Sequence, residues 1–375
     1  MAIKIVPIST QTEVLKFIKC HWNFYENDNH WVPPVIVDRL KLLDTEKNPF
    51  YKHSKIQLFL AENNNGIVGR IAAIKNDNHN IAHDDKTGFF GFFECIDDQE
   101  VARSLFDSAA SWLRNEGLDI MRGPMNPSIN DEIGLLIEGF NSSPVVLMTY
   151  NPKYYISLIE NYGFIKSKDL YAYLVKYENY MSEKMKRMQY IISQRYNVTY
   201  RNINFKDKAQ FRKDVDIVKH IYNVAWEKNW GAVKMTDEEF DFLAADLKQF
   251  AEPSLAFMLE SKGNVVGFAL ALPDINQSLI NNKKGHLLGA AWHLLTKKKS
   301  IDLVRILVLG VLPEYRGSGL DALMYYEVGQ RAKNLNIFQG EASWILEDNV
   351  MMNRGLTTTM SSEIYKKYRI YDKQI

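Results

Sequence analysis

The sequence predicts two mixed α/β domains, each built on a mostly antiparallel sheet flanked by helices. Three observations predict this fold class. The chain has 375 residues, more than a single hydrophobic core normally serves. One hairpin pattern occurs twice, and the helices and strands around it follow the same order in both halves. We therefore place one domain at residues 1–177, a connecting helix at 178–196 and a second domain at 197–375.

The repeated hairpin recurs at a constant offset of 198 residues, from Phe59 to Phe257. In each copy an apolar run ends in a polar turn and a second apolar run follows, which is the pattern of a β-hairpin. Because the neighbouring elements also agree in order, an internal duplication explains the match. The identical pairs are Phe59/Phe257, Glu62/Glu260, Val68/Val266, Gly69/Gly267 and Ala73/Ala271.

The elements around each hairpin correspond as well. Each half has an aromatic-rich helical stretch before the hairpin, a long helical pattern after it and an aromatic strand at its end. The first half has these at Phe17–Trp31, Glu100–Asn115 and Leu170–Tyr173, and the second half at Ile221–Trp230, Leu320–Asn334 and Tyr365–Tyr371. The halves differ after the hairpin, where the first is predicted to have a polar loop (76–86) and the second a longer insert (274–300).

Composition excludes several classes of protein. Apolar residues make up 46% of the chain and charged residues 24%, which is too apolar for a disordered chain. The formal net charge is +1, so no global field attracts nucleic acid or an anionic membrane. Cys20 and Cys95 are the only cysteines, which argues against a disulfide framework and a zinc module and favours a reducing compartment.

The chain termini and apolar runs indicate a cytoplasmic protein without a transmembrane segment. Residues 1–8 lack the features of a secretory signal and are predicted to form the first strand. The longest apolar run, His286–Leu295, has about half the length that a membrane-spanning helix needs. In the second half's insert, the helical segment 286–299 is predicted to pack at a dry interface between the halves, with contact to a lipid surface as the alternative.

The segment 303–327 carries the most chemical information. An apolar strand, Val304–Val311, is followed by a turn with Arg316, Gly317, Ser318 and Gly319, and a helix starts near Leu320. Glycines at a strand-to-helix turn let backbone N–H groups converge on an anion, and the positive end of the helix dipole lies behind them. The pattern predicts a phosphate-binding turn that is neither a dinucleotide fingerprint nor a P-loop.

These residues resemble the central motif of the GNAT acyltransferase superfamily, which Val311, Pro313, Arg316 and Gly319 match. The resemblance implies that the turn, Arg316 to Leu320, holds the pyrophosphate of coenzyme A. It also implies that backbone groups of Leu309, Gly310 and Val311 bind the pantetheine arm where two parallel strands separate. The whole chain resembles a group of tandem GNAT proteins of uncharacterised substrate, so acetyl-CoA is the implied co-substrate.

A later family element resembles the segment 344–354. Asn349 matches the family's asparagine and is implied to contribute to cofactor binding. Seven residues on, Leu356 stands where many members place a tyrosine that protonates the departing thiolate. Tyr365, Tyr368 or a water are the alternatives for this proton. As the base that deprotonates the amine we prefer Glu347, two residues before Asn349, and place Glu341 second.

The first half has a different turn at the equivalent place. Asp97, Asp98 and Glu100 are acidic and would repel a pyrophosphate. We therefore predict that the first domain is degenerate and has lost donor binding.

Several other groups have two interpretations. Trp226, Asn229 and Trp230 lie where the superfamily places its acceptor-binding segment, so they are candidate substrate residues, although two tryptophans four residues apart usually indicate core packing. Thr236 and Glu239 fit a helix capping box, and the acidic run Asp237–Asp246 fits a solvated face better than an amine site. His79, His83, Asp84 and Asp85 fit a solvated loop better than a metal site, so we predict no metal.

The resulting function prediction is N-acetyl transfer from acetyl-CoA to a small-molecule or peptide amine in the second domain. One alternative is a non-catalytic coenzyme A sensor or scaffold, which Leu356 supports. Another is a transferase that uses aminoacyl-tRNA, although the near-neutral charge argues against a nucleic-acid partner. The sequence leaves the choice between monomer and dimer open.

Overall fold

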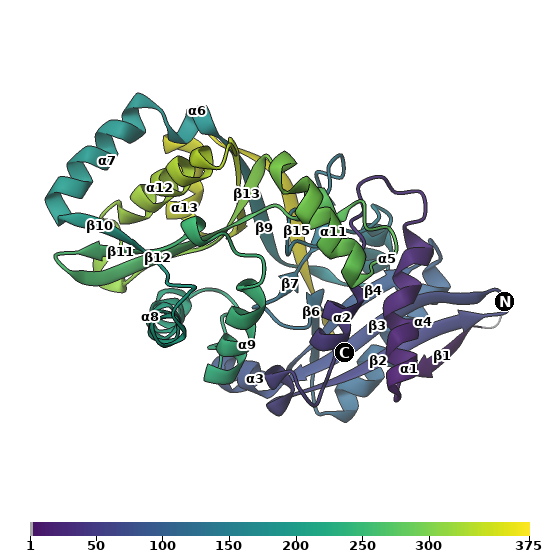
Figure 1. The fold of residues 1–375 in the computed structure, drawn as a ribbon. Helices are drawn as coiled ribbons and strands as arrows, with labels where there is room; N and C mark the ends of the chain where they lie inside the picture. Colours follow the sequence, from purple (N-terminus) through teal and green to yellow (C-terminus); the bar gives the residue numbers. More distant parts are fainter. Residues whose placement is uncertain (1–2) are drawn as a thin grey trace. The chain divides into compact units, whose positions relative to one another are not determined.

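The computed structural model describes residues 3–375, and Met1 and Ala2 of the predicted first strand lie outside the described residues. The chain divides into two compact units (Figure 1). Unit 1 contains the chain up to Leu170 together with Ser278–Lys297 and Lys366–Ile375, and unit 2 contains Tyr171–Gln277 and Lys298–Tyr365. Each unit is thus made of segments that are separated in sequence. The predicted domains 1–177 and 197–375, with the connecting helix 178–196, were based on the order of the repeat along the chain and stay a prediction.

The sheet of unit 1 has the neighbour order β1-β2-β3-β4-β5-β15. All of these neighbours pair antiparallel except β4 and β5, which are parallel. The strands are β1 (Lys4–Pro7), β2 (Ser54–Asn63), β3 (Gly66–Asn76), β4 (Thr87–Cys95), β5 (Ile120–Gly123), β6 (Met125–Asn126), β7 (Glu132–Ile133), β8 (Leu135–Glu138), the start of β9 (Ile165–Lys176) and most of β15 (Glu363–Gln374). The helices are α1 (Gln11–Lys19), α2 (Ile36–Leu42), α3 (Asp77–His83), α4 (Gln99–Asn115), α5 (Tyr155–Asn161) and α11 (Leu287–Lys297).

Unit 2 repeats this plan with the order β10-β11-β12-β13-β14-β9, in which β13 and β14 are the parallel pair. Its strands are β10 (Val198–Asn202), β11 (Ala256–Ser261), β12 (Asn264–Pro273), β13 (Leu303–Val311) and β14 (Gln339–Leu346), with the end of β9. Its helices are α6 (Tyr177–Tyr180), α7 (Glu183–Tyr196), α8 (Lys208–Trp226), α9 (Asp237–Leu247), α12 (Leu320–Asn334) and α13 (Val350–Arg354), with a π-helical turn at Gly355–Thr359. The short helix α10 (Asn276–Leu279) spans the boundary between the two units.

The predicted repeat is confirmed in the strand register. Phe59 pairs with Ile71 in unit 1, and the residues 198 positions later, Phe257 and Ala269, pair in unit 2. Both hairpins also contain a register shift at the same place, after Ala61 in one and after Leu259 in the other. Two hairpins with one pattern of apolar residues therefore fold into one register.

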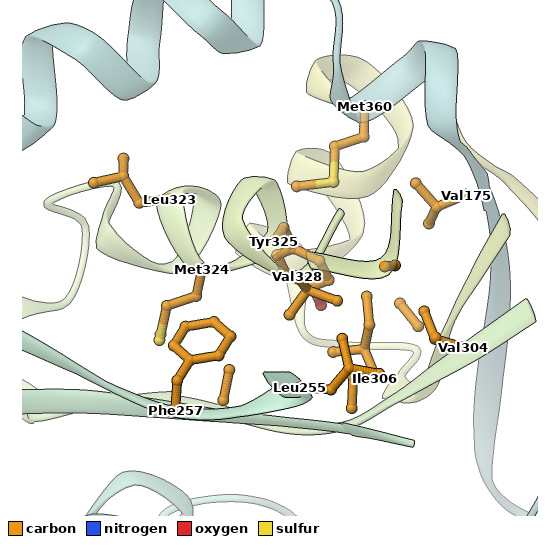
Figure 2. Packing of buried hydrophobic residues seen from close by; sticks show 14 of the residues in the cluster. Val175, Leu255, Phe257, Val304, Ile306, Leu323, Met324, Tyr325, Val328 and Met360 are labelled. Carbon is orange, nitrogen blue, oxygen red and sulfur yellow. The ribbon is translucent and has the colours of Figure 1, made fainter. Parts of the chain in front are cut away.

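The core of unit 2 lies between its sheet and α12. Figure 2 shows Met324, Tyr325 and Val328 of α12 above Phe257 and Ile306 of the sheet. Apolar residues recur along α12 at helical spacing, so burial of one face fixes the helix against the strands. In unit 1, α4 covers β2 and β3 in the same way.

Some predicted elements differ in extent. The predicted polar loop at 76–86 is wrong, because Asn76 caps α3 there by accepting a hydrogen bond from His79 N (3.2 Å), and His79 is 2% exposed. The predicted helix 17–31 ends early, since α1 stops at Lys19 and a 3₁₀ helix follows to Phe24. In the part of the chain that the structure describes, no helix combines the length and the hydropathy needed to cross a membrane.

Candidate functional site

The parallel strands of unit 2 separate at a defined point. β13 and β14 pair from Leu303/Gln339 to Ile306/Ala342 and not beyond. β13 continues to Val311 on the side of β12, where a register shift between Leu270 and Ala271 accommodates one extra residue in β13. A bulge of this kind bends a strand away from its neighbour. The predicted residues Leu309, Gly310 and Val311 therefore lie on the separated part of β13.

The turn after β13 leads directly into α12. Gly317 and Gly319 have φ of +73° and +84°, a backbone region that glycine adopts without steric cost. Gly319 is the N-cap of α12 and has no side chain with which to cap it, although Ser318 Oγ lies 3.3 Å from Leu320 N. The exposed Arg316 donates a hydrogen bond to the carbonyl of Ala225 (2.7 Å). The turn thus presents helix N–H groups and a cation at its surface.

The end of α8 covers the separated part of β13. A Cβ placed on Gly310 would lie 2.5 Å from the indole ring of Trp226. Trp226 also stacks on Tyr222 at a centroid distance of 4.8 Å. Asn229 lies in the turn that follows, where its N–H donates to the carbonyl of Trp226 (2.8 Å), and Trp230 is half-buried beside it. Trp226, one of the three predicted substrate residues, thus lies against β13.

A buried polar cluster lies beside the point of separation, on the face of the sheet that α8 covers. Arg305 is the register partner of Glu341, and these residues are 3% and 0% exposed. Arg305 Nε donates to Ser343 Oγ (3.1 Å). The carboxylate of Glu341 accepts hydrogen bonds from the hydroxyls of Ser343 and Tyr365. Four polar side chains thus converge where the strands part.

The face of this cluster follows from strand alternation. Val304, Ile306 and Ala342 belong to the core under α12, so their neighbours Arg305 and Glu341 face the other way. Glu341 and Tyr365 were candidates from the sequence, whereas Arg305 and Ser343 were not predicted. A charged residue inside each of two apolar strands was the available signal for the Arg305–Glu341 pair.

Two relatives match nearly the whole chain. A bacterial ceramide synthase from Caulobacter vibrioides is 32% identical over 382 residues, covering 100% of this chain and 98% of the relative. Protein YghO from Escherichia coli K12 is 32% identical over 373 residues, covering 97% of this chain and 94% of YghO. No protein-family model matches the chain.

Solved structures share the fold over the full length. A tandem GNAT protein from the clavulanic acid biosynthesis pathway has a TM-score of 0.59 at 12% identity, covering 100% of this chain and 98% of that protein. A GCN5-related N-acetyltransferase from Sphaerobacter thermophilus has a TM-score of 0.52 at 10% identity, covering 99% and 95%. This chain belongs to the family of the bacterial ceramide synthase and YghO. Its fold is that of tandem GNAT proteins, so the predicted resemblance and the predicted fold class are confirmed.

In unit 1, the space where the two parallel strands separate is filled by the chain itself. β4 and β5 pair only from Thr87/Ile120 to Phe89/Arg122, as the parallel strands of the second unit do. A Cβ on Gly91 would lie 1.7 Å from the carbonyl oxygen of Met125, and Phe92 N donates to Asn126 Oδ1 (2.6 Å). The backbone at Met125 therefore occupies the space between the strands. The amide oxygen of Asn126 accepts a hydrogen bond from the backbone N–H of Phe92 in β4.

The helix that follows β4 is also capped from within. Asp98 is the N-cap of α4, and its carboxylate accepts hydrogen bonds from Glu100 N (2.8 Å) and Val101 N (3.4 Å). These are the N–H groups that an anion would use at a helix N-terminus. The observation supports the proposal that the first GNAT unit no longer binds a donor.

The first GNAT unit instead contains a buried network around Glu94, which is 6% exposed. Its carboxylate accepts hydrogen bonds from Tyr25 (2.9 Å) and Tyr155 (2.8 Å), and Arg70 lies at 3.5 Å. Burial raises the pKa of Glu94, but contacts with His21, Arg70 and Tyr155 outweigh it and hold the pKa below its ordinary value. The network ties the N-terminal helical segment to β4.

The predicted residues after β14 have structural partners. Asn349 caps α13 by accepting from Met352 N (3.2 Å), so its implied contribution to cofactor binding stays a prediction. Glu347 follows the last residue of β14, and Asn353 Nδ2 donates to its backbone carbonyl (3.1 Å). Leu356 is 0% exposed in the core of the second unit. The position of the family's tyrosine is thus part of the hydrophobic core.

The remaining sequence predictions concern a cap and a metal. The capping box of Thr236 and Glu239 is confirmed, with Thr236 N donating to Glu239 Oε2 (2.7 Å). His79 Nε2 lies 3.6 Å from Asp85 Oδ2. Over residues 3–375, no three His, Cys, Asp or Glu side chains gather as metal ligands would.

Proposed function

We propose that the second GNAT unit transfers a long-chain acyl group from an acyl-CoA to the amine of a long-chain amino alcohol. The observation that carries the proposal is the separation of β13 from β14 beyond Ile306 and Ala342, next to the glycine turn that opens α12. The family membership supports acyl transfer to nitrogen from a coenzyme A thioester. The separated strands and the turn supply the two parts of a site for such a donor.

The choice of acyl group and acceptor rests on the relative. Ceramide is an amide between a fatty acyl chain and the amine of a long-chain amino alcohol, and one relative is named a ceramide synthase. This favours a long acyl chain over the acetyl group that the sequence prediction named. The acceptor is an amine whether the transferred group is a long acyl chain or an acetyl group.

In the reaction, the amine nitrogen attacks the thioester carbonyl carbon. The C–N bond forms, the C–S bond breaks, the nitrogen loses a proton to a base and the thiolate gains one. Positioning of the two reactants supplies much of the rate, and a base at hydrogen-bond distance supplies more. The carboxylate of Glu341 is a candidate for this base because it lies in the cluster beside the strand separation.

Glu347, the base preferred from sequence, remains the second candidate. It lies past the end of β14, farther along the strand than Glu341. Tyr365 is a candidate donor of the thiolate's proton, since its hydroxyl belongs to the same cluster. Water is the alternative, because Leu356 has no proton to give.

The first experiment measures donor binding by calorimetry with acetyl-CoA and with palmitoyl-CoA. We expect one site per chain and tighter binding of palmitoyl-CoA. Gly317→Asp should weaken binding far more than Gly317→Asn, since a Cβ at Gly317 has no atom within 4 Å and the two side chains differ mainly in charge. Equal affinity of both variants would show that the pyrophosphate lies elsewhere.

The second experiment measures transfer to sphinganine and to a short amine of the same head structure. Amide formation with sphinganine and palmitoyl-CoA is the expected result. Transfer of acetyl alone would restore the acetyl prediction. Binding of coenzyme A esters without transfer to either amine would favour the non-catalytic sensor, for which the buried Leu356 is the supporting observation.

A further inference from the structure

The helix α11 of unit 1 turns an apolar face toward solvent. Leu287, Leu288, Trp292 and Leu295 are 58%, 85%, 66% and 82% exposed. With the exposed Ala291, they form one continuous arc at about 100° per residue around the helix. This arrangement reverses the usual one, in which a surface helix buries its apolar side. These side chains thus lie at the surface, and the predicted dry interface between the halves stays a prediction.

The opposite side of α11 is buried or half-buried. Ala290 is 4% exposed, and His293 and Leu294 on the same side are half-buried. The exposed arc is therefore the outer face of a helix whose inner face is packed.

The start of α11 is held firmly on unit 1. The carbonyl of Gly285 accepts from Ile36 N (2.9 Å), and the carbonyl of Lys283 accepts from Trp22 Nε1 (2.6 Å). Gly285 has a φ of +63° and packs so tightly that a Cβ there would lie 2.5 Å from the carbonyl oxygen of Pro34. A fixed helix that displays apolar side chains is suited to binding a surface.

Positive charge surrounds the apolar arc. Lys283 and Lys284 precede α11 and are exposed, and Lys297 ends it. An open groove of about 740 Å³ runs beside the helix start, between α1, α2 and residues 281–289. The groove is also lined by Lys19 and by the apolar side chains of Leu15, Ile36, Val37 and Leu40. Among the described residues that line it, none carries a carboxylate.

We propose that α11 and this groove form a docking surface for an anionic phospholipid bilayer. Leucines and a tryptophan on one helix face, flanked by lysines, are the features with which interfacial helices enter the headgroup region. Lysines beside such a face pair with lipid phosphates. The helix is too short to cross the bilayer, so it would lie in the plane of the interface.

Charge favours a bilayer over a second copy of the chain. A two-fold interface through this face would bring the same basic surface of both copies together, so that the lysines of one copy would meet a groove whose described lining contains lysines and no carboxylate. Anionic lipid provides the complementary charge that the patch itself does not contain. Docking would hold unit 1 at the surface where long-chain substrates reside, but the inference stands on α11 alone.

The test is sedimentation of the purified full chain with vesicles, without acyl donor or amine. We expect binding to vesicles that contain phosphatidylglycerol, weakening as salt rises, and little binding to pure phosphatidylcholine. The triple change Leu288→Ser, Trp292→Ser and Leu295→Ser should remove binding. Lys283→Glu with Lys284→Glu should weaken it about ten-fold or more, since about one charge-assisted contact is lost and one repulsion gained per site.

Ile81→Ser provides the matched control, because Ile81 is 80% exposed on α3 of the same unit but lies outside the patch. It should bind vesicles as wild type does. The thermal midpoint of the triple variant shows that loss of binding is not loss of fold. Wild-type binding by the triple variant would overturn the proposal. So would absence of vesicle binding together with self-association that the triple change removes, which would assign the face to a second copy.

Discussion

The indole ring of Trp226 lies over Gly310, leaving no room for a Cβ, which would lie 2.5 Å from the ring. The contact joins the end of α8 to the part of β13 that has separated from β14. The ring therefore covers one side of that strand at Gly310. Glycine is needed at position 310 because the indole ring approaches the strand backbone closely, and not because the backbone turns there.

We expect Gly310→Ala to displace Trp226 and to lower the free energy of unfolding by about 1–3 kcal/mol, the usual effect of overpacking. Thermal and urea unfolding measure the change. Gly355→Ala is the matched control, since Gly355 has helical φ and ψ and no atom within 4 Å of an added Cβ. That variant should be neutral or slightly stabilised. Equal stability of the two variants would contradict the described contact.

Glu341→Gln is expected to lower kcat about 100-fold, the lower range of the effect of a general base, with little change in acyl-CoA affinity. Glutamine keeps the shape of the side chain, but it has one carbonyl oxygen to accept from Ser343 or Tyr365, its amide nitrogen only donates, and it takes up no proton. Glu347→Gln is the comparison. If Glu347→Gln loses activity while Glu341→Gln keeps it, Glu347 is the base. Calorimetry with acyl-CoA separates lost chemistry from lost binding.

His79 makes stability depend on pH. Burial lowers the pKa of His79 to about 4, against the attraction of Asp85, while in the unfolded chain the ring titrates near about 6.5. Because the unfolded chain takes up the proton first, the folded state loses stability as pH falls below about 6.5. The loss amounts to about 2 kcal/mol by about pH 5.

His79→Gln should remove this part of the acid sensitivity. Urea unfolding at about pH 7 and about pH 5 gives the loss for each protein. We expect the loss to be smaller in the variant than in wild type. An equal loss in both would mean that His79 stays solvated and protonates freely in the folded state, contrary to its 2% exposure.

Leu356→Tyr tests whether the family's tyrosine can be restored. Leu356 is fully buried, so the larger ring should overpack the core and cost about 1–3 kcal/mol without raising kcat. Leu356→Met, close to it in volume, should cost less than about 1.5 kcal/mol. Higher activity in the tyrosine variant would show that position 356 reaches the thiolate after all.

Sequence patterns predicted the parts of the fold that depend on local periodicity. The helix at 320–334 has the predicted bounds, because its apolar residues recur at one spacing and a glycine turn opens it. The same reasoning failed at 76–86, where one asparagine cap outweighs a polar composition and forms α3.

The candidate site was harder to predict because it depends on pairs that are distant in sequence. Arg305 and Glu341 meet only through the register of two parallel strands, and Ser343 follows from the same register. Trp226 was singled out for its spacing, but its contact with Gly310 depends on how α8 crosses the sheet. The filling of the first unit's strand separation by Met125 and Asn126 likewise has no local signature.

The last ten residues of the chain, Lys366–Ile375, complete the sheet of unit 1. A ribosome therefore releases the first half of the repeat long before it makes β15, the strand that pairs antiparallel with β5. Until then β5 presents an open edge, the kind of surface that invites wrong pairing. If the chain were cut between the duplicated halves, the first half would therefore lack this antiparallel partner of β5.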